Sequence, residues 1–185
     1  GKVWSILVNQ DIDMICFTWS SEVWKKLYNI ASKKFIPVLM ELWWSAPWIV
    51  FEDADIDKVI ETIYFNKFLN CWQVCDGLKR LIVHESKFEE VIDKLKDIIE
   101  SKKVWLAESK ETEIWPLVSK KQLDLIIEQV DDAIWKNAKV ITWWNSPDNL
   151  NWAFYKPTLV TKVNTEMRIW KEEVFWPVLP VVKFK

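Results

Sequence analysis

The balance of tryptophan and glycine is the feature that most constrains how this chain can fold. Its 185 residues include 15 Trp but only 2 Gly, whereas glycine makes up about 7% of an average protein. Turns that need a positive φ normally use glycine, because any other residue pays a Cβ penalty there. The tryptophans nevertheless lie beside Pro, Ser, Asn and Asp, as in "VITWWNSPDN" and "VFWPVLP", which are turn neighbourhoods. The sequence therefore places a bulky aromatic side chain at turn positions that normally have glycine.

Charge and cysteine usage exclude several classes of function. A formal net charge of -2 gives no electrostatic reason to expect binding to nucleic acid or an anionic membrane. No apolar run approaches the roughly 18 residues of a membrane span and no basic-then-apolar leader opens the chain, so we expect a cytoplasmic protein. Three cysteines without metal-site spacing and a single histidine, His84, argue against a structural metal. We expect His84 to be a surface residue at a strand end, so any catalytic base is expected to be a carboxylate.

Hydrophobic periodicity predicts an α/β fold with a largely parallel sheet, because amphipathic helices alternate with short apolar strands. The expected helices cover approximately 21–33, 55–70, 86–100 and 119–134. The expected strands cover 5–8, 14–18, 35–42, 49–51, 78–83, 139–142, 155–160 and 178–184.

Two polar residues have positions suited to catalysis. Cys75 follows a long predicted helix at a turn toward a strand, where backbone donors can activate a thiol as a nucleophile. Glu41 ends an otherwise apolar strand in "MELWWSAPW", where a desolvated carboxylate can act as a base. The residues by themselves leave two other interpretations open: a small buried cysteine, and a glutamate in an ion pair or at a solvated strand end.

When tryptophan is read as glycine, several segments become specific. They run "FTGSSEVG", "MELGGSAP", "GQVC" and "EEVFGP", and Cys75 follows Glu41 by 34 residues. These motifs, together with "EIWPLVS", "NAKVITWW" and "NWAFYKPTLV", resemble the aldehyde dehydrogenase superfamily in the same order over essentially the whole chain. Nearly every Trp stands where that family has Gly, Trp170 being the least certain. We interpret this as a codon-reading difference, since UGA encodes glycine in some bacterial lineages.

The resemblance implies the three-layer aldehyde dehydrogenase fold and a reaction. An aldehyde, with a semialdehyde as one candidate, would be oxidised to a carboxylic acid with NAD or NADP. Cys75 would attack the aldehyde carbon, and its own backbone N–H would donate to the resulting oxyanion. After hydride transfer, water activated by Glu41 would hydrolyse the thioester.

The resemblance also implies cofactor contacts. In the family a strand-turn-helix holds the pyrophosphate, the second Glu of "EEVFGP" holds the nicotinamide ribose, and the following Phe packs near the ring. The carried-over residues are Trp19, Ser20, Val23, Leu42, Gln122, Glu173 and Phe175. The family's basic residue three positions after Gln122 is Leu125 here, which departs from the pattern.

The same resemblance implies how the chain is organised. Residues 1–42 correspond to the C-terminal part of a cofactor-binding domain and residues 43–185 to an incomplete catalytic domain. We therefore expect a fragment that is inactive alone, from a parent that forms a homodimer or homotetramer and binds a small aldehyde. Three alternatives remain: a CoA-acylating relative, a tryptophan-rich platform for carbohydrate or peptide, and a non-catalytic structural relative.

Overall fold

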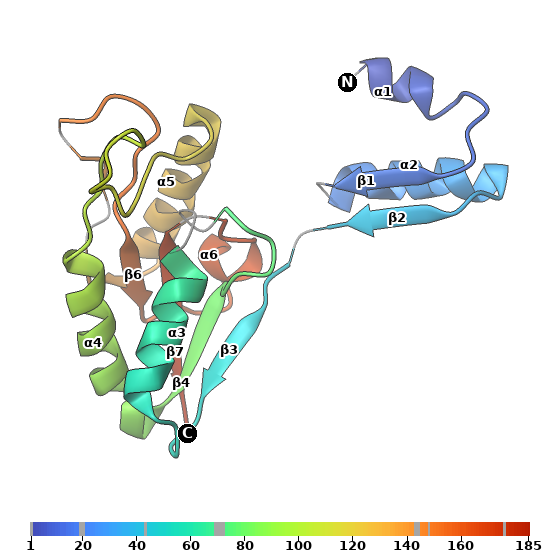
Figure 1. The fold of residues 1–185 in the computed structure, drawn as a ribbon. Helices are drawn as coiled ribbons and strands as arrows, with labels where there is room; N and C mark the ends of the chain where they lie inside the picture. Colours follow the sequence, from blue (N-terminus) through green and yellow to red (C-terminus); the bar gives the residue numbers. More distant parts are fainter. Residues whose placement is uncertain are drawn as a thin grey trace. The chain divides into compact units, whose positions relative to one another are not determined.

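The computed structural model describes residues 2–18, 21–42, 44–68, 73–142, 145–147, 149–175 and 177–185. It divides into two compact units, residues 1–44 and 45–185, here called the N-terminal unit and the C-terminal unit (Figure 1). The boundary lies close to the domain boundary expected from the sequence, but the functional assignment of the two domains stays a prediction.

The N-terminal unit is a strand-helix-strand motif preceded by a short helix. Strands β1 (Ile15–Thr18) and β2 (Val38–Glu41) pair in parallel, with Ile15 opposite Val38 and Thr18 opposite Glu41, and the 14-residue helix α2 (Ser21–Lys34) connects them. A small core holds this motif together through Val8, Ile15, Leu27 and Ala31.

The first element differs from the expectation. Residues 5–8 were predicted as a strand, but Lys2–Leu7 forms helix α1. A short apolar run does not distinguish helix from strand by periodicity. Helix α1 leaves Val3, Ile6 and Leu7 exposed, and only the next residue, Val8, enters the core.

The C-terminal unit is built on a five-stranded sheet with the order β3-β4-β7-β6-β5. Its first three strand pairs are parallel, and only β5 and β6 pair antiparallel. The strands are β3 (Pro47–Val50), β4 (Arg80–His84), β5 (Lys139–Val140), β6 (Thr158–Thr161) and β7 (Val178–Phe184). The prediction of a largely parallel sheet is confirmed.

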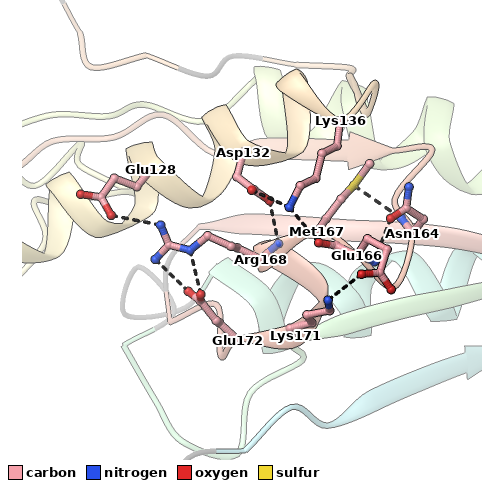
Figure 2. A network of polar contacts seen from close by, with 9 residues as sticks. All are labelled: Glu128, Asp132, Lys136, Asn164, Glu166, Met167, Arg168, Lys171 and Glu172. Carbon is pink, nitrogen blue, oxygen red and sulfur yellow. Dashed lines mark hydrogen bonds and ion pairs between the residues drawn. The ribbon is translucent and has the colours of Figure 1, made fainter.

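Helices cover both faces of this sheet. Helices α3 (Ile56–Phe68) and α4 (Phe88–Glu100) contact each other on one face, and α5 (Lys120–Trp135) and the short α6 (Arg168–Lys171) contact each other on the other (Figures 1 and 2). A 3-10 turn, η2 (Glu85–Lys87), precedes α4. The sequence analysis missed α6 and η2, since single turns carry too little periodicity to detect.

Local chemistry explains why the long helices begin where they do. Asp55 accepts a hydrogen bond from the Lys58 backbone N–H at the start of α3, and Ser119 accepts one from the Gln122 backbone N–H at the start of α5. Side-chain oxygens at these positions satisfy N–H groups that the helix itself leaves unpaired. His84 ends β4 and accepts the Ser86 N–H through Nδ1, which agrees with its expected place at a strand end.

Trp152 has a backbone conformation that suits glycine. Its φ is 135°, inside the positive range where a side chain is strained and glycine is not. The backbone conformation at Trp152 therefore agrees with the glycine that the sequence pattern indicates there.

Candidate functional site

The loop that carries Cys75 connects α3 to β4 in the C-terminal unit. Cys75 is exposed with a free thiol. Before it, the Gln73 side-chain oxygen accepts the Val118 backbone N–H at 2.8 Å. After it, the Lys79 and Arg80 N–H groups both donate to the Ala46 carbonyl, at 3.2 and 3.3 Å. The thiol is therefore presented to solvent by a loop that is held at both ends, so the interpretation of Cys75 as a small buried residue is wrong.

Two buried lysines lie against this loop. Lys67, in the last turn of α3, donates from Nζ to the Leu78 carbonyl at 3.1 Å. Lys79 donates from Nζ to the Val74 carbonyl at 2.9 Å, and Val74 is the residue before Cys75. Both side chains are fully buried. The ammonium groups therefore bind carbonyls on each side of the nucleophile candidate.

Lys79 also contacts two residues predicted to face the cofactor. Its Nζ lies 3.3 Å from Glu173 Oε1, with side-chain exposures of 1% and 8%, and 4.3 Å from the centre of the Phe175 ring. The structure thus brings the Cys75 loop, Glu173 and Phe175 together around one ammonium. The Lys79 side chain therefore lies inside the core.

Burial and charge shift the pKa of both lysines. Burial, then the charge of Lys79, place the pKa of Lys67 well below its ordinary 10.5, against a smaller opposing effect of Glu173. Burial also lowers the pKa of Lys79, although Glu173, Cys75 and Asp76 counteract it. Opposite charges therefore offset the cost of burying these two ammonium groups only in part.

A second polar network holds the backbone of the same segment from the α5 side. The buried Gln129 donates from Nε2 to Glu172 Oε2 at 3.0 Å and to the Glu173 carbonyl at 3.4 Å. Arg168 bridges Glu172, at 2.7 and 3.1 Å, and Glu128 on α5, at 3.1 Å (Figure 2). The segment that bears Glu173 is therefore fastened by its backbone to α5 and by its side chain to Lys79.

Further contacts extend this network around the start of α6. The Arg168 backbone N–H donates to Asp132 Oδ2 at 2.8 Å, and Lys136 pairs with Asp132 at 2.7 Å. Figure 2 shows Asp132 and Lys136 projecting from α5 toward the turn that contains Asn164, Glu166 and Met167, whereas Glu128 projects toward Arg168. Helix α6 is thereby anchored on α5 just before the Glu172–Glu173 pair.

Several other predicted site residues belong to the N-terminal unit. Glu41 ends β2 there and is exposed within that unit, and its expected role as a desolvated base stays a prediction. Val23 is exposed on α2, and Leu42, just after β2, is half-buried. Trp19 and Ser20 fall outside the described residues. The convergence of Glu41 with Cys75 stays a prediction.

Gln122 lies in the first turn of α5 with a half-buried side chain. Its backbone N–H is engaged by Ser119, and Leu125, one turn later, packs against the main core. The predicted cofactor contact of Gln122 therefore stays a prediction too.

Sequence reasoning missed Lys67 and the role of Lys79. A signal was present for Lys67, which continues the buried face of α3 after Ile56, Ile60 and Ile63 at helical spacing. A lysine in such a face is uncommon unless its ammonium finds a partner. For Lys79 no such pattern exists, because its partners come from segments distant in sequence.

The described residues contain neither a metal-binding group nor a membrane-spanning helix. Among them, no three His, Cys, Asp or Glu side chains are grouped so that they could bind a metal ion. Their helices also include none with the length and apolar character to cross a bilayer.

Comparisons with known proteins agree with this architecture. The chain is 37% identical to aminoaldehyde dehydrogenase 1, peroxisomal, from Pisum sativum, and 35% identical to betaine aldehyde dehydrogenase, chloroplastic, from Atriplex hortensis. Each alignment covers 97% of this chain and 36% of the relative. The chain thus spans little more than a third of the length of these relatives.

Solved structures give the same result. An aldehyde dehydrogenase from Bacillus cereus superposes with a TM-score of 0.92 at 32% identity, over 99% of this chain and 37% of that one. The betaine aldehyde dehydrogenase of Staphylococcus aureus in complex with NAD+ also has a TM-score of 0.92, at 27% identity over the same shares of the two chains. These likenesses confirm the predicted α/β fold.

The family model described as "Aldehyde dehydrogenase family" matches residues 3–185, nearly the whole chain. The order of the motifs, the parallel sheet and the exposed thiol after α3 lead to the same conclusion. The chain belongs to the aldehyde dehydrogenase family.

Proposed function

We propose that the complete protein oxidises an aldehyde to a carboxylic acid with NAD or NADP. The observation that carries this proposal is the exposed Cys75 thiol on a braced loop, whose Lys79 contacts Glu173 and Phe175. A thiol presented in this way can add to a carbonyl carbon. The aminoaldehyde and betaine aldehyde dehydrogenases among the relatives support an aldehyde substrate.

The described residues suit a dinucleotide in two places. Strand β1 leads toward the N-terminus of the 14-residue helix α2, and the free N–H groups of a helix N-terminus favour a phosphate. Glu173 offers a carboxylate of fixed position for ribose hydroxyls. The bound cofactor would supply hydride acceptance, and the residues of the chain would hold it and the substrate.

Cys75 and Glu41 would divide the chemistry between them. The Cys75 thiolate adds to the aldehyde carbon, and the carbonyl electron pair moves onto oxygen beside the Cys75 N–H. Loss of hydride leaves a thioester on Cys75. Glu41 then takes a proton from water, the resulting hydroxide attacks the thioester carbon, and the C–S bond breaks to release the carboxylic acid.

An assay of the complete protein, purified from its own source, tests this proposal. We expect reduced dinucleotide to form with NAD or NADP on a panel of aminoaldehyde, betaine aldehyde and semialdehyde substrates. Cys75→Ser should abolish the reaction, whereas Cys16→Ser, which removes another exposed thiol, should leave it unchanged. An active Cys75→Ser protein would rule out the proposed nucleophile.

The identity of the residues at the tryptophan positions decides whether this chemistry can proceed. We propose that the natural protein carries glycine at Trp43, Trp44 and Trp72, where a ring would obstruct the close backbone approach that the family pattern uses. Tandem mass spectrometry of the purified protein tests this directly. Tryptophan in those peptides, or UGG codons in the gene, would end the recoding hypothesis and turn attention to a binding or structural role.

Location and assembly remain proposals of the same kind. We propose a cytoplasmic homodimer or homotetramer. Cell fractionation and light scattering of the complete protein test these two statements, and a purely monomeric species would contradict the second.

A further inference from the structure

Lys79 makes contacts that the proposed reaction does not use. Its Nζ donates to the Val74 carbonyl at 2.9 Å and lies 3.3 Å from Glu173 Oε1. The same atom lies 4.3 Å from the centre of the Phe175 ring. The buried Lys79 ammonium therefore contacts the peptide that precedes Cys75. It also contacts two of the predicted cofactor-binding residues, Glu173 and Phe175.

Core stability alone does not call for a lysine at this position. Burying an ammonium is costly, and an apolar side chain of similar size would often pack equally well. The cost is increased by Lys67, a second buried lysine whose pKa the charge of Lys79 lowers. The groups that favour a charged Lys79 are Glu173, Cys75 and Asp76. These favourable partners belong to the candidate site.

We propose that Lys79 is a positioning residue that couples the Cys75 loop to the Glu173–Phe175 segment. Through Val74 it fixes the peptide beside the thiol, and through Glu173 and Phe175 it fixes the segment expected to contact the cofactor. This inference rests on the proposed function, because it assigns Glu173 to the dinucleotide.

The coupling has a geometric reason. Gln129 holds the Glu173 backbone to α5, and Lys79 binds the Glu173 carboxylate. Lys79 orients it from the loop that also bears the thiol. Any movement of that loop is therefore transmitted to the carboxylate, and the distance between the thiol and the ribose contact is maintained.

Lys79→Met in the complete protein removes the ammonium while keeping an unbranched side chain. Two measurements apply: hydrogen exchange without ligand, and calorimetric titration with NAD and with NADP. We expect exchange in both 73–78 and 172–175 to become faster. We expect the dinucleotide Kd to rise about tenfold, as for the loss of one charge-assisted hydrogen bond.

Lys67→Met is the matched control, since it removes a neighbouring buried lysine that contacts Leu78. It should accelerate exchange in 73–78 only and leave the dinucleotide Kd unchanged. Faster exchange in only one of the two segments after Lys79→Met would overturn the proposal. Equal effects of both substitutions on Kd would overturn it as well.

Two further measurements allow the Lys79→Met experiment to be interpreted if the variant does not fold or if the dinucleotide does not bind. If Lys79→Met does not fold, Lys79→Gln, which retains a polar side chain without the charge, is measured in the same way and is expected to give the same two effects. If the unsubstituted protein binds neither dinucleotide, the proposed function fails, while the exchange measurements still decide whether Lys79 couples the two segments.

Discussion

Two polar clusters hold the segment around Glu173, and they differ in almost every physical respect. The lysine cluster, consisting of Lys67, Lys79 and Glu173, is buried, and the Glu173 carboxylate pairs with Lys79. In the arginine network the Arg168 and Glu172 side chains are 34% and 33% exposed, and Glu128, Glu172 and Asp132 all contact Arg168. Burying charged groups costs stability, whereas a partly exposed network with several partners contributes a little. We infer that the Lys79–Glu173 pair serves the site and the arginine network serves the fold.

Substituting Glu173, the acidic partner in the buried Lys79–Glu173 pair, should have the largest effect on stability. Glu173→Gln removes the carboxylate that pairs with the buried Lys79, and removing one partner of a buried pair costs about 3 kcal/mol. Chemical denaturation measures this loss in the free energy of unfolding. The double variant Glu173→Gln/Lys79→Met should recover much of it, and a double variant as unstable as the single one would contradict this account.

Breaking the arginine network should cost less. Arg168→Met removes the guanidinium contacts with Glu128 and Glu172 but leaves the Arg168 backbone bond to Asp132. For a network this exposed we expect a loss of about 1 kcal/mol, reduced further by high salt. A loss as large as that of Glu173→Gln would remove the distinction drawn between the two clusters.

The lysine cluster should make stability depend on alkaline pH. The pKa of Lys67 is below its unfolded value of 10.5 in the folded chain. Between these two values the unfolded chain binds more protons, so stability rises as pH increases from the lowered pKa toward 10.5. Denaturation midpoints across this range should show the rise. Lys67→Met should reduce it, leaving the contribution of Lys79, which has the same direction.

The arginine network should make stability depend on acidic pH, and this should be the smallest of the four effects. Burial acts to raise the pKa of Glu172, but Arg168 and Gln129 outweigh it and hold that pKa below the ordinary 4.5. This stabilisation is present above 4.5 and is lost as pH falls through the lowered value. Arg168→Met should therefore weaken the acid dependence of stability and leave the alkaline dependence unchanged.

Much of the fold could be predicted because its signals are local. The pattern over 86–100 placed α4, where Val91, Ile92, Leu95 and Ile99 are buried. Asp55 and Ser119 marked the starts of α3 and α5 through a side-chain oxygen that a helix start needs. Residues 5–8 were misassigned, since the three apolar residues Ile6, Leu7 and Val8 fit either period and only the surrounding packing selects one.

Less of the candidate site could be predicted. Cys75 was found from its place after a helix and from family motifs, and its exposure agrees with a nucleophile. Lys79 was not found, because its partners Val74 and Glu173 belong to a loop and to a segment far along the chain. Arg80 likewise depends on a distant segment: it is half-buried, with its guanidinium 4.7 Å from the centre of the Trp170 ring.

The sequence by itself determined most of the order of helices and strands, the family and the identity of the candidate nucleophile. Each of these depends on residue spacing and short motifs, which are present in the linear sequence before the chain folds. Only the tertiary structure decided which charges share the core with the Cys75 loop. Whether an ammonium is solvated or buried beside a carboxylate depends on what the fold brings against it, and the chain contacts that decide this form only when β4, α5 and α6 pack together.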